Sequence, residues 1–170
     1  MMLIVKVDEL IDEIGKLNAE IERLRAAIHA PFEITEGVVI TADEARDIFR
    51  NHLPHNTFLY ELLDTSYFIP KLEDTQQFIT WLGLDRAQYI PQRRDCDNFG
   101  FYAAAAISFI CGVNPIFPVW DFSSMHFYDF ILTPDRDIFV YEPQTGEITT
   151  MGEFKPDPLH KLERGKIYGF

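Results

Sequence analysis

The sequence has few cysteines, and their positions exclude several classes of protein. Cys96 and Cys111 are the two cysteines among 170 residues, too few for a disulfide framework and without the paired spacing of a zinc site. On one helix they would lie roughly 22 Å apart, because each residue adds about 1.5 Å, so they cannot bond each other. Free thiols are typical of a reducing compartment, and we therefore expect a cytoplasmic protein.

The sequence also lacks a basic cluster, a long apolar run and a glycine-rich phosphate motif. With 27 acidic and 15 basic residues it carries a net charge of −12, which repels phosphate backbones and excludes a nucleic-acid partner. Its longest helix-like apolar run, Phe99–Val113, is too short to cross a bilayer. Acidic residues from Asp8 onward interrupt the N-terminus before a signal peptide could form, so no membrane partner is expected.

Residues 1–30 carry a heptad pattern, with Val or Ile at each a position and Leu at each d position. This pattern favours a parallel two-stranded coiled coil and therefore predicts a homo-oligomer. The alternative is a single amphipathic helix packed on its own domain. Pro31 ends the helix and leaves residues 31–170 for one domain. The seam residues are Val7, Leu10, Ile14, Leu17, Ile21, Leu24 and Ile28.

The remainder mixes helical and extended segments. Thr41–Glu44 is a capping box that predicts a helix ending near Leu53. Leu72–Leu82 predicts a second helix, which Gly83 ends. Further along, residues 126–132 and 138–144 flank the turn sequence of residues 133–137, which predicts an antiparallel hairpin.

Cys96 stands directly before the apolar run, at the predicted N-terminus of a helix, where the helix dipole favours a thiolate. His126 and Glu142 follow in the chain order of a nucleophile, a base and an orienting acid. If Tyr128 faces Glu142 in the hairpin, His126 and Glu142 lie diagonally on one face. These residues predict a cysteine hydrolase that cleaves a peptide or amide bond of a peptide or protein substrate through a thioester.

Other residues are assigned to the site or left out of it. The Cys96 backbone N–H and the side-chain amide of Gln92 or Gln88 are candidates for the oxyanion hole, and Gln144 is expected to line the site. Cys111 fits an inert buried thiol. The alternative for each member of the triad is an ordinary structural role, because buried cysteines and satisfied core histidines are common.

Three short motifs carry a family resemblance: Asp95-Cys96-Asp97-Asn98-Phe99, the strand from His126, and Tyr141-Glu142-Pro-Gln-Thr-Gly. Over roughly residues 60–150 the chain resembles the C-terminal cysteine-protease domain of the Marasmius-type mushroom agglutinin, of which stand-alone relatives occur in bacteria and phages. The resemblance implies an α+β papain-like domain with a central buried helix and an antiparallel sheet. It implies a triad of Cys96, His126 and Glu142.

The same resemblance implies calcium-dependent proteolysis, with Asp95 and Asp97 as candidate calcium ligands. The agglutinin's lectin domain has no counterpart here, so its glycan binding does not transfer. Two alternative functions stay open. One is a non-catalytic structural or adaptor protein, for instance phage-encoded, that keeps an inactive papain-like body. The other is an acyltransferase or transglutaminase-type enzyme with the same triad.

Overall fold

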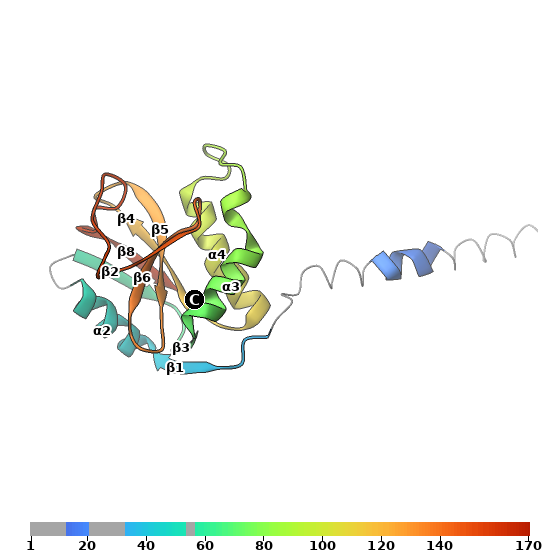
Figure 1. Cartoon of the computed structure of the whole chain (residues 1–170), viewed down its shortest axis with the longest axis horizontal. Helices are drawn as coiled ribbons and strands as arrows, with labels where there is room; N and C mark the ends of the chain where they lie inside the picture. The colour runs from blue at the N-terminus through green and yellow to red at the C-terminus, as the bar shows by residue number, and fades with distance from the viewer. Residues whose placement is uncertain (1–12, 21–32, 54–56) are drawn as a thin grey trace, which may run out of the picture. The chain divides into compact units, whose positions relative to one another are not determined.

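A computed structural model describes residues 13–20, 33–53 and 57–170, and it divides the chain into two units, residues 1–32 and 33–170 (Figure 1). In the first unit, residues 13–20 are helical. Ile14 and Leu17 of the predicted seam are 57% and 59% exposed. The other seam positions lie outside the described residues, so pairing through this helix stays a prediction.

The second unit is built on a six-stranded mixed sheet in the order β2-β8-β4-β5-β6-β7. The edge pair β2 and β8 runs parallel, and each of the other neighbouring pairs runs antiparallel. The strands are β2 (Thr57–Leu62), β4 (Ile116–Asp121), β5 (His126–Leu132), β6 (Ile138–Glu142), β7 (Glu147–Thr150) and β8 (Arg164–Gly169).

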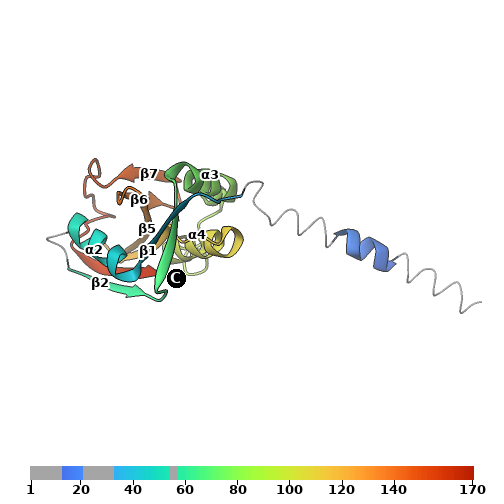
Figure 2. The same cartoon turned by 90° about the horizontal axis from the view of Figure 1, so that it is seen from below.

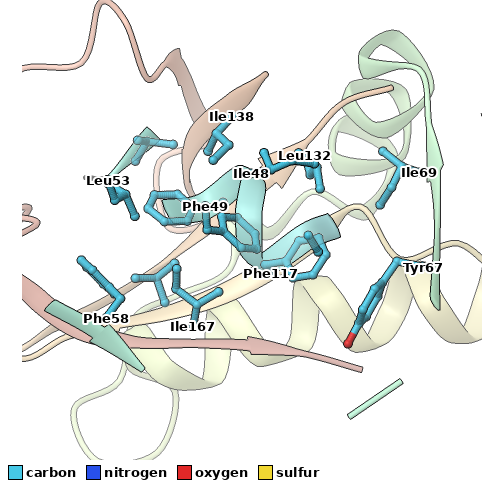
Figure 3. Close-up of a cluster of buried hydrophobic side chains, with 14 of the residues drawn as sticks. Ile48, Phe49, Leu53, Phe58, Tyr67, Ile69, Phe117, Leu132, Ile138 and Ile167 are labelled. Carbon is cyan, nitrogen blue, oxygen red and sulfur yellow. The ribbon is translucent and has the colours of Figure 1, made fainter. Parts of the chain in front are cut away.

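Helix α2 (Ala42–His52) covers one face of this sheet, beside a two-stranded sheet of β1 (Gly37–Thr41) and β3 (Ser66–Pro70). The predicted capping box at its start is confirmed: the Glu44 amide donates to the Thr41 hydroxyl, and the Thr41 amide donates to the Glu44 carboxylate. The core between helix and sheet is shown in Figure 3. It includes Ile48, Phe49, Leu53, Phe58, Tyr67, Ile69, Phe117, Leu132, Ile138 and Ile167.

Helix α4 (Cys96–Cys111) packs against β4 and β5 on the opposite face, with α3 (Leu72–Leu82) beside it (Figure 2). A short 3-10 turn, η1 (Leu84–Arg86), follows α3, which ends at Gly83 as predicted, with φ 64°. Among the described residues, no helix is long and apolar enough to span a membrane.

The expected fold, an α+β papain-like domain with a central buried helix and an antiparallel sheet, is wrong. The sheet is mixed, because two segments far apart in the sequence, β2 and β8, pair in parallel at its edge. Helix α4 is not central but lies on a sheet face with one side open to solvent. Its residues Phe101, Tyr102 and Phe109 are 37%, 56% and 87% exposed. An unbroken apolar run therefore resembles a buried helix even where aromatic residues face outward.

Gly100 marks a close approach of α4 to β5. A Cβ atom added there would lie 2.8 Å from the Phe127 ring and 2.8 Å from Oδ1 of Asp129, well inside ordinary contact. A residue without a side chain lets the helix settle this closely onto the strand. Because Cys96 lies about one turn earlier on the same helix, this contact also sets the position of its sulfur.

We expect Gly100→Ala to destabilise the protein, although alanine is the better helix former by about 1 kcal/mol. The added methyl group would force α4 away from β5, and such overpacking costs about 1–3 kcal/mol. Urea unfolding measures the net change. The control is Ala105→Gly on the exposed side of the same helix, which should lose only the propensity difference. An unchanged or higher free energy of unfolding in Gly100→Ala would contradict the close packing.

Candidate functional site

Cys96 is the first residue of α4, and a tight loop holds it there. The N-cap residue Asp95 is extended, with φ −113° and ψ −170°. In the preceding loop the amide of Ile90 donates to the carbonyl of Arg94 at 2.8 Å, and the amide of Arg94 donates to the carbonyl of Ile90 at 2.8 Å. The first N–H groups of a helix have no acceptor within it. The predicted placement of Cys96 at a helix N-terminus is therefore confirmed.

His126 and Glu142 lie diagonally on one face of the β5–β6 hairpin, as predicted, and their side chains are in contact. In the β5–β6 pair Asp129 lies opposite Tyr141, which places Tyr128 opposite Glu142 and His126 diagonal to it. The Nε2 atom of His126 lies 2.7 Å from Oε2 of Glu142. Their side chains are only 11% and 13% exposed, so solvent screens this pair weakly.

The site favours a charged His126. Burial lowers the pKa of His126, but hydrogen bonds with Cys96 and Glu142 outweigh burial and raise the pKa to about 9. Burial raises the pKa of Glu142, but hydrogen bonds from His126, His160 and the Gln144 amide outweigh burial and lower the pKa to about 2. Near neutral pH the two side chains therefore form an imidazolium–carboxylate pair. Because Nε2 is occupied by Glu142, Nδ1 remains for the Cys96 sulfur.

His160 belongs to the same network, although the sequence analysis did not single it out. Its Nε2 atom lies 3.4 Å from Oε2 of Glu142, and its Nδ1 atom lies 3.1 Å from Oδ2 of Asp157. Burial lowers the pKa of His160, but these two carboxylates outweigh burial and raise it. The local signal was Asp157, whose Oδ1 accepts from the amides of Leu159 and His160 at 2.6 and 3.0 Å in a turn. That turn motif does not reveal that the loop returns to Glu142.

Of the three candidate glutamines, Gln88 and Gln92 lie away from the cavity beside Cys96, whereas Gln144 contacts Glu142. Gln88 and Gln92 are exposed, and neither lines the cavity beside Cys96. Gln92 instead shapes the loop before α4: its φ is 60°, and its amide donates to Oδ2 of Asp95 at 3.2 Å. Gln144 does join the site, but through its backbone amide, which donates to Oε1 of Glu142 at 3.1 Å.

Asp95 and Asp97 line the cavity beside Cys96. A hydrogen bond with Asp95, together with burial, raises the pKa of Asp97. Calcium takes about six to eight oxygen ligands. The other residues that line this cavity are mostly aromatic, so the pair does not form a complete calcium site and we derive no step through calcium. Calcium binding stays a prediction.

His126, Glu142 and His160 also have the donor atoms of a metal site, within 4.8 Å of one another. Two imidazoles and one carboxylate suit a transition metal. Here, however, the same atoms hydrogen-bond each other, with Glu142 as the shared acceptor. A metal would also draw His126 away from Cys96. We therefore interpret the cluster as a proton-holding network.

The chain was compared with known proteins, and neither a sequence family nor a curated protein matches it. Solved structures match its fold. The match to the PSL1a–E64 complex has a TM-score of 0.61 at 16% identity and covers 75% of this chain and 51% of that one. Polyporus squamosus lectin bound to the human-type influenza-binding epitope Neu5Acα2-6Galβ1-4GlcNAc matches with a TM-score of 0.53 at 17% identity, covering 65% and 45%. The chain thus spans about half the length of these structures, and the likeness concerns the fold alone.

These matches correct the family resemblance. The sequence motifs predict a papain-like domain of the Marasmius-type agglutinin, whereas the solved structures that match this fold include the PSL1a–E64 complex and Polyporus squamosus lectin. The assignment of the fold to the papain-like domain of that agglutinin family is therefore wrong. The motifs cover only short stretches around Cys96, His126 and Glu142. Such stretches describe local chemistry and do not determine the fold that carries them.

The buried pair makes stability depend on pH. The raised pKa of His126 contributes stability that is complete below its ordinary value of 6.5 and is lost as the pH rises through about 9. The lowered pKa of Glu142 contributes stability that is complete above its ordinary value of 4.5 and is lost as the pH falls through about 2. Both contributions are complete between these two ordinary values.

We expect Glu142→Gln to lower the free energy of unfolding at about pH 6, by about 1–3 kcal/mol, because the buried imidazolium loses its counter-charge. The loss should shrink at about pH 10, where His126 is neutral. Urea unfolding at both pH values measures it. Glu147→Gln is the matched control, since Glu147 lies opposite Glu142 on β7 but is exposed. Equal losses at both pH values would argue against a charged pair.

Proposed function

We propose that the chain is a cysteine hydrolase that cleaves a peptide or amide bond through Cys96, His126 and Glu142. The observation that carries this proposal is the position of His126, which lines the same cavity as Cys96 and is hydrogen-bonded to the buried carboxylate of Glu142. An inert structural cysteine needs neither partner. A nucleophilic cysteine needs a proton acceptor and benefits from a group that orients that acceptor.

The first half-reaction follows from the charges of the pair. The proton given up by Cys96 resides on His126, whose raised pKa keeps the ring protonated near neutral pH. The sulfur attacks the carbonyl carbon, and the backbone N–H of Cys96 at the start of α4 receives the developing oxyanion. The C–N bond then breaks, His126 gives its proton to the leaving amine, and a thioester remains on Cys96.

The second half-reaction is the hydrolysis of that thioester. His126, now neutral, takes a proton from a water molecule as its oxygen attacks the thioester carbon. The C–S bond breaks, the carboxylic acid leaves, and the thiolate–imidazolium pair is restored. Glu142 stays ionised throughout and stabilises the imidazolium each time it forms. An acyltransferase would differ only in the acceptor, and product analysis with and without an added amine separates the two.

The structural neighbours offer support for thiol chemistry and for a second candidate function. PSL1a forms a complex with E64, and E64 is an epoxide that alkylates reactive cysteine thiolates. It is therefore a suitable probe of Cys96.

Polyporus squamosus lectin binds a sialylated glycan, which favours carbohydrate binding as the alternative function. This chain spans only part of that lectin. Calorimetric titration of the protein with the same glycan tests this alternative. If protein whose Cys96 has first been alkylated still binds the glycan with release of heat, carbohydrate binding is favoured.

The two free thiols, Cys96 and Cys111, support a reducing, cytoplasmic location. They also provide an internal comparison. Cys96 interacts with the His126 ring, whereas burial raises the pKa of the Cys111 thiol at the far end of α4 and disfavours its thiolate.

We expect iodoacetamide and E64 to modify Cys96 much faster than Cys111 near neutral pH. Peptide mapping by mass spectrometry measures the two rates in the same molecule, with and without added calcium. His126→Ala should slow the reaction of Cys96 at least about tenfold, within the range for loss of an activating base, and leave Cys111 unchanged. If Cys96 reacts no faster than a free model thiol under either condition, the proposed function is refuted.

We also propose that the chain self-associates through its N-terminal helix, as the exposure of Ile14 and Leu17 supports. We expect sedimentation at micromolar concentration to show a dimer. Replacing both Ile14 and Leu17 with Gln should shift it to monomer, because polar residues at a and d positions destabilise a coiled coil. The control places Gln at Lys16, outside the seam. A monomeric wild-type chain would remove this proposal.

A further inference from the structure

The cavity beside Cys96 offers a means of substrate recognition. We propose that it binds a large apolar or aromatic side chain next to the scissile amide bond, an inference that rests on the proposed function. The cavity has a volume of about 320 Å³, with Cys96 and His126 in its wall. The rest of its lining is mainly apolar and comes from Phe101, Trp120, Met125, Phe127 and Tyr168.

Part of the wall of this cavity is a packed aromatic cluster. Trp120 of β4 and Phe127 of β5 are paired neighbours in the sheet, so both side chains point to the face that α4 covers. The ring of Phe101 on α4 lies 4.8 Å from that of Phe127 and 5.4 Å from that of Tyr168 on β8. Because side chains from both the helix and the sheet form this wall, the pocket exists before any ligand binds. This lowers the entropic cost of binding.

The rim of the cavity exposes apolar surface beside the proposed catalytic pair. Trp120 is 41% exposed and Met125 is 74% exposed. Met125 also has φ 55°, a left-handed conformation that is strained for a residue with a long side chain. It directly precedes His126. Strained residues collect at functional sites, and this one contributes to the cavity lining a flexible apolar side chain of a kind that adapts to varied partners.

The volume of the cavity and the charge of its lining restrict which substrate side chains it can bind. Ligand pockets usually measure roughly 300–1,000 Å³, so about 320 Å³ suits one large side chain rather than a folded segment. Asp95 and Asp97, which flank Cys96 in the sequence, also line the cavity and would repel an acidic side chain. The expected substrates are therefore peptides that carry a residue such as Phe, Leu or Met beside the cleaved bond, and not Asp or Glu.

Amino-acid chloromethyl ketones test this inference directly. In each, the Cys96 thiolate forms an S–C bond and displaces chloride, so differences in rate report recognition of the side chain. We compare N-acetyl Phe, Gly and Asp reagents, each normalised to its rate with a free model thiol. The Phe reagent should modify Cys96 at least roughly tenfold faster than the Gly reagent. The Asp reagent should be slowest.

Two variants locate the preference in the cavity. Trp120→Ala and Met125→Asn should each reduce the Phe-over-Gly ratio several-fold. Asparagine tolerates the left-handed backbone at position 125, so that variant keeps the fold even if loss of Trp120 does not. Phe109→Ala is the matched control, because this aromatic residue is 87% exposed on α4 and does not line the cavity. Its ratio should equal that of the wild type.

Iodoacetamide separates failure of this inference from failure of the proposed function, since the reagent has no side chain to place in the cavity. Fast modification of Cys96 by iodoacetamide, with equal normalised rates for the Phe and Gly reagents, would overturn the subsite and leave the hydrolase proposal intact. The subsite is also overturned if neither cavity variant changes the ratio. If iodoacetamide does not distinguish Cys96 from Cys111, the subsite falls together with the proposed function.

Discussion

The imidazole of His126, held between a thiol and a carboxylate, is the interaction on which the site depends. Glu142 binds one ring nitrogen at 2.7 Å and supplies the counter-charge, while Cys96 lines the same cavity as the ring and helps to raise its pKa. The three residues come from the end of β6, the start of β5 and the start of α4. Hydrogen bonds weaken when their atoms move apart by about half an ångström, so the surrounding fold must hold these three element ends closely.

Packing on both faces of β5 holds the ends of these three elements in place. On one face, Gly100 lets α4 settle onto the strand. On the other, the ring of His160 lies 4.9 Å from that of Tyr128 and supports the carboxylate of the pair. The contact between α4 and β5 also buries a carboxyl group, which is energetically unfavourable. Burial raises the pKa of Asp129 far above its usual range, so its carboxyl group is neutral, and neither oxygen has a hydrogen-bond partner within the described part of the chain.

Features that depend on chain neighbours could be predicted from the sequence. They include the cap at Thr41, the start of α4 at Cys96 and the hairpin that joins His126 to Glu142. The parallel β2–β8 edge could not, because pairing between distant segments leaves no periodic signal. The same limit hid His160, which a long loop returns to the site. Gln144 was expected to line the site, and the contact that it makes there comes from its backbone amide, which residue type does not predict.

The most direct test is the NMR titration of the His126 ring in the wild-type protein and in Cys96→Ser. The wild-type ring should titrate at about pH 9, because the sulfur and Glu142 both favour its charged form. Replacing the sulfur with a hydroxyl group removes its share of that effect, so the pKa of His126 should fall toward its ordinary value. A wild-type pKa near 6.5, or a value that Cys96→Ser leaves unchanged, would contradict the account.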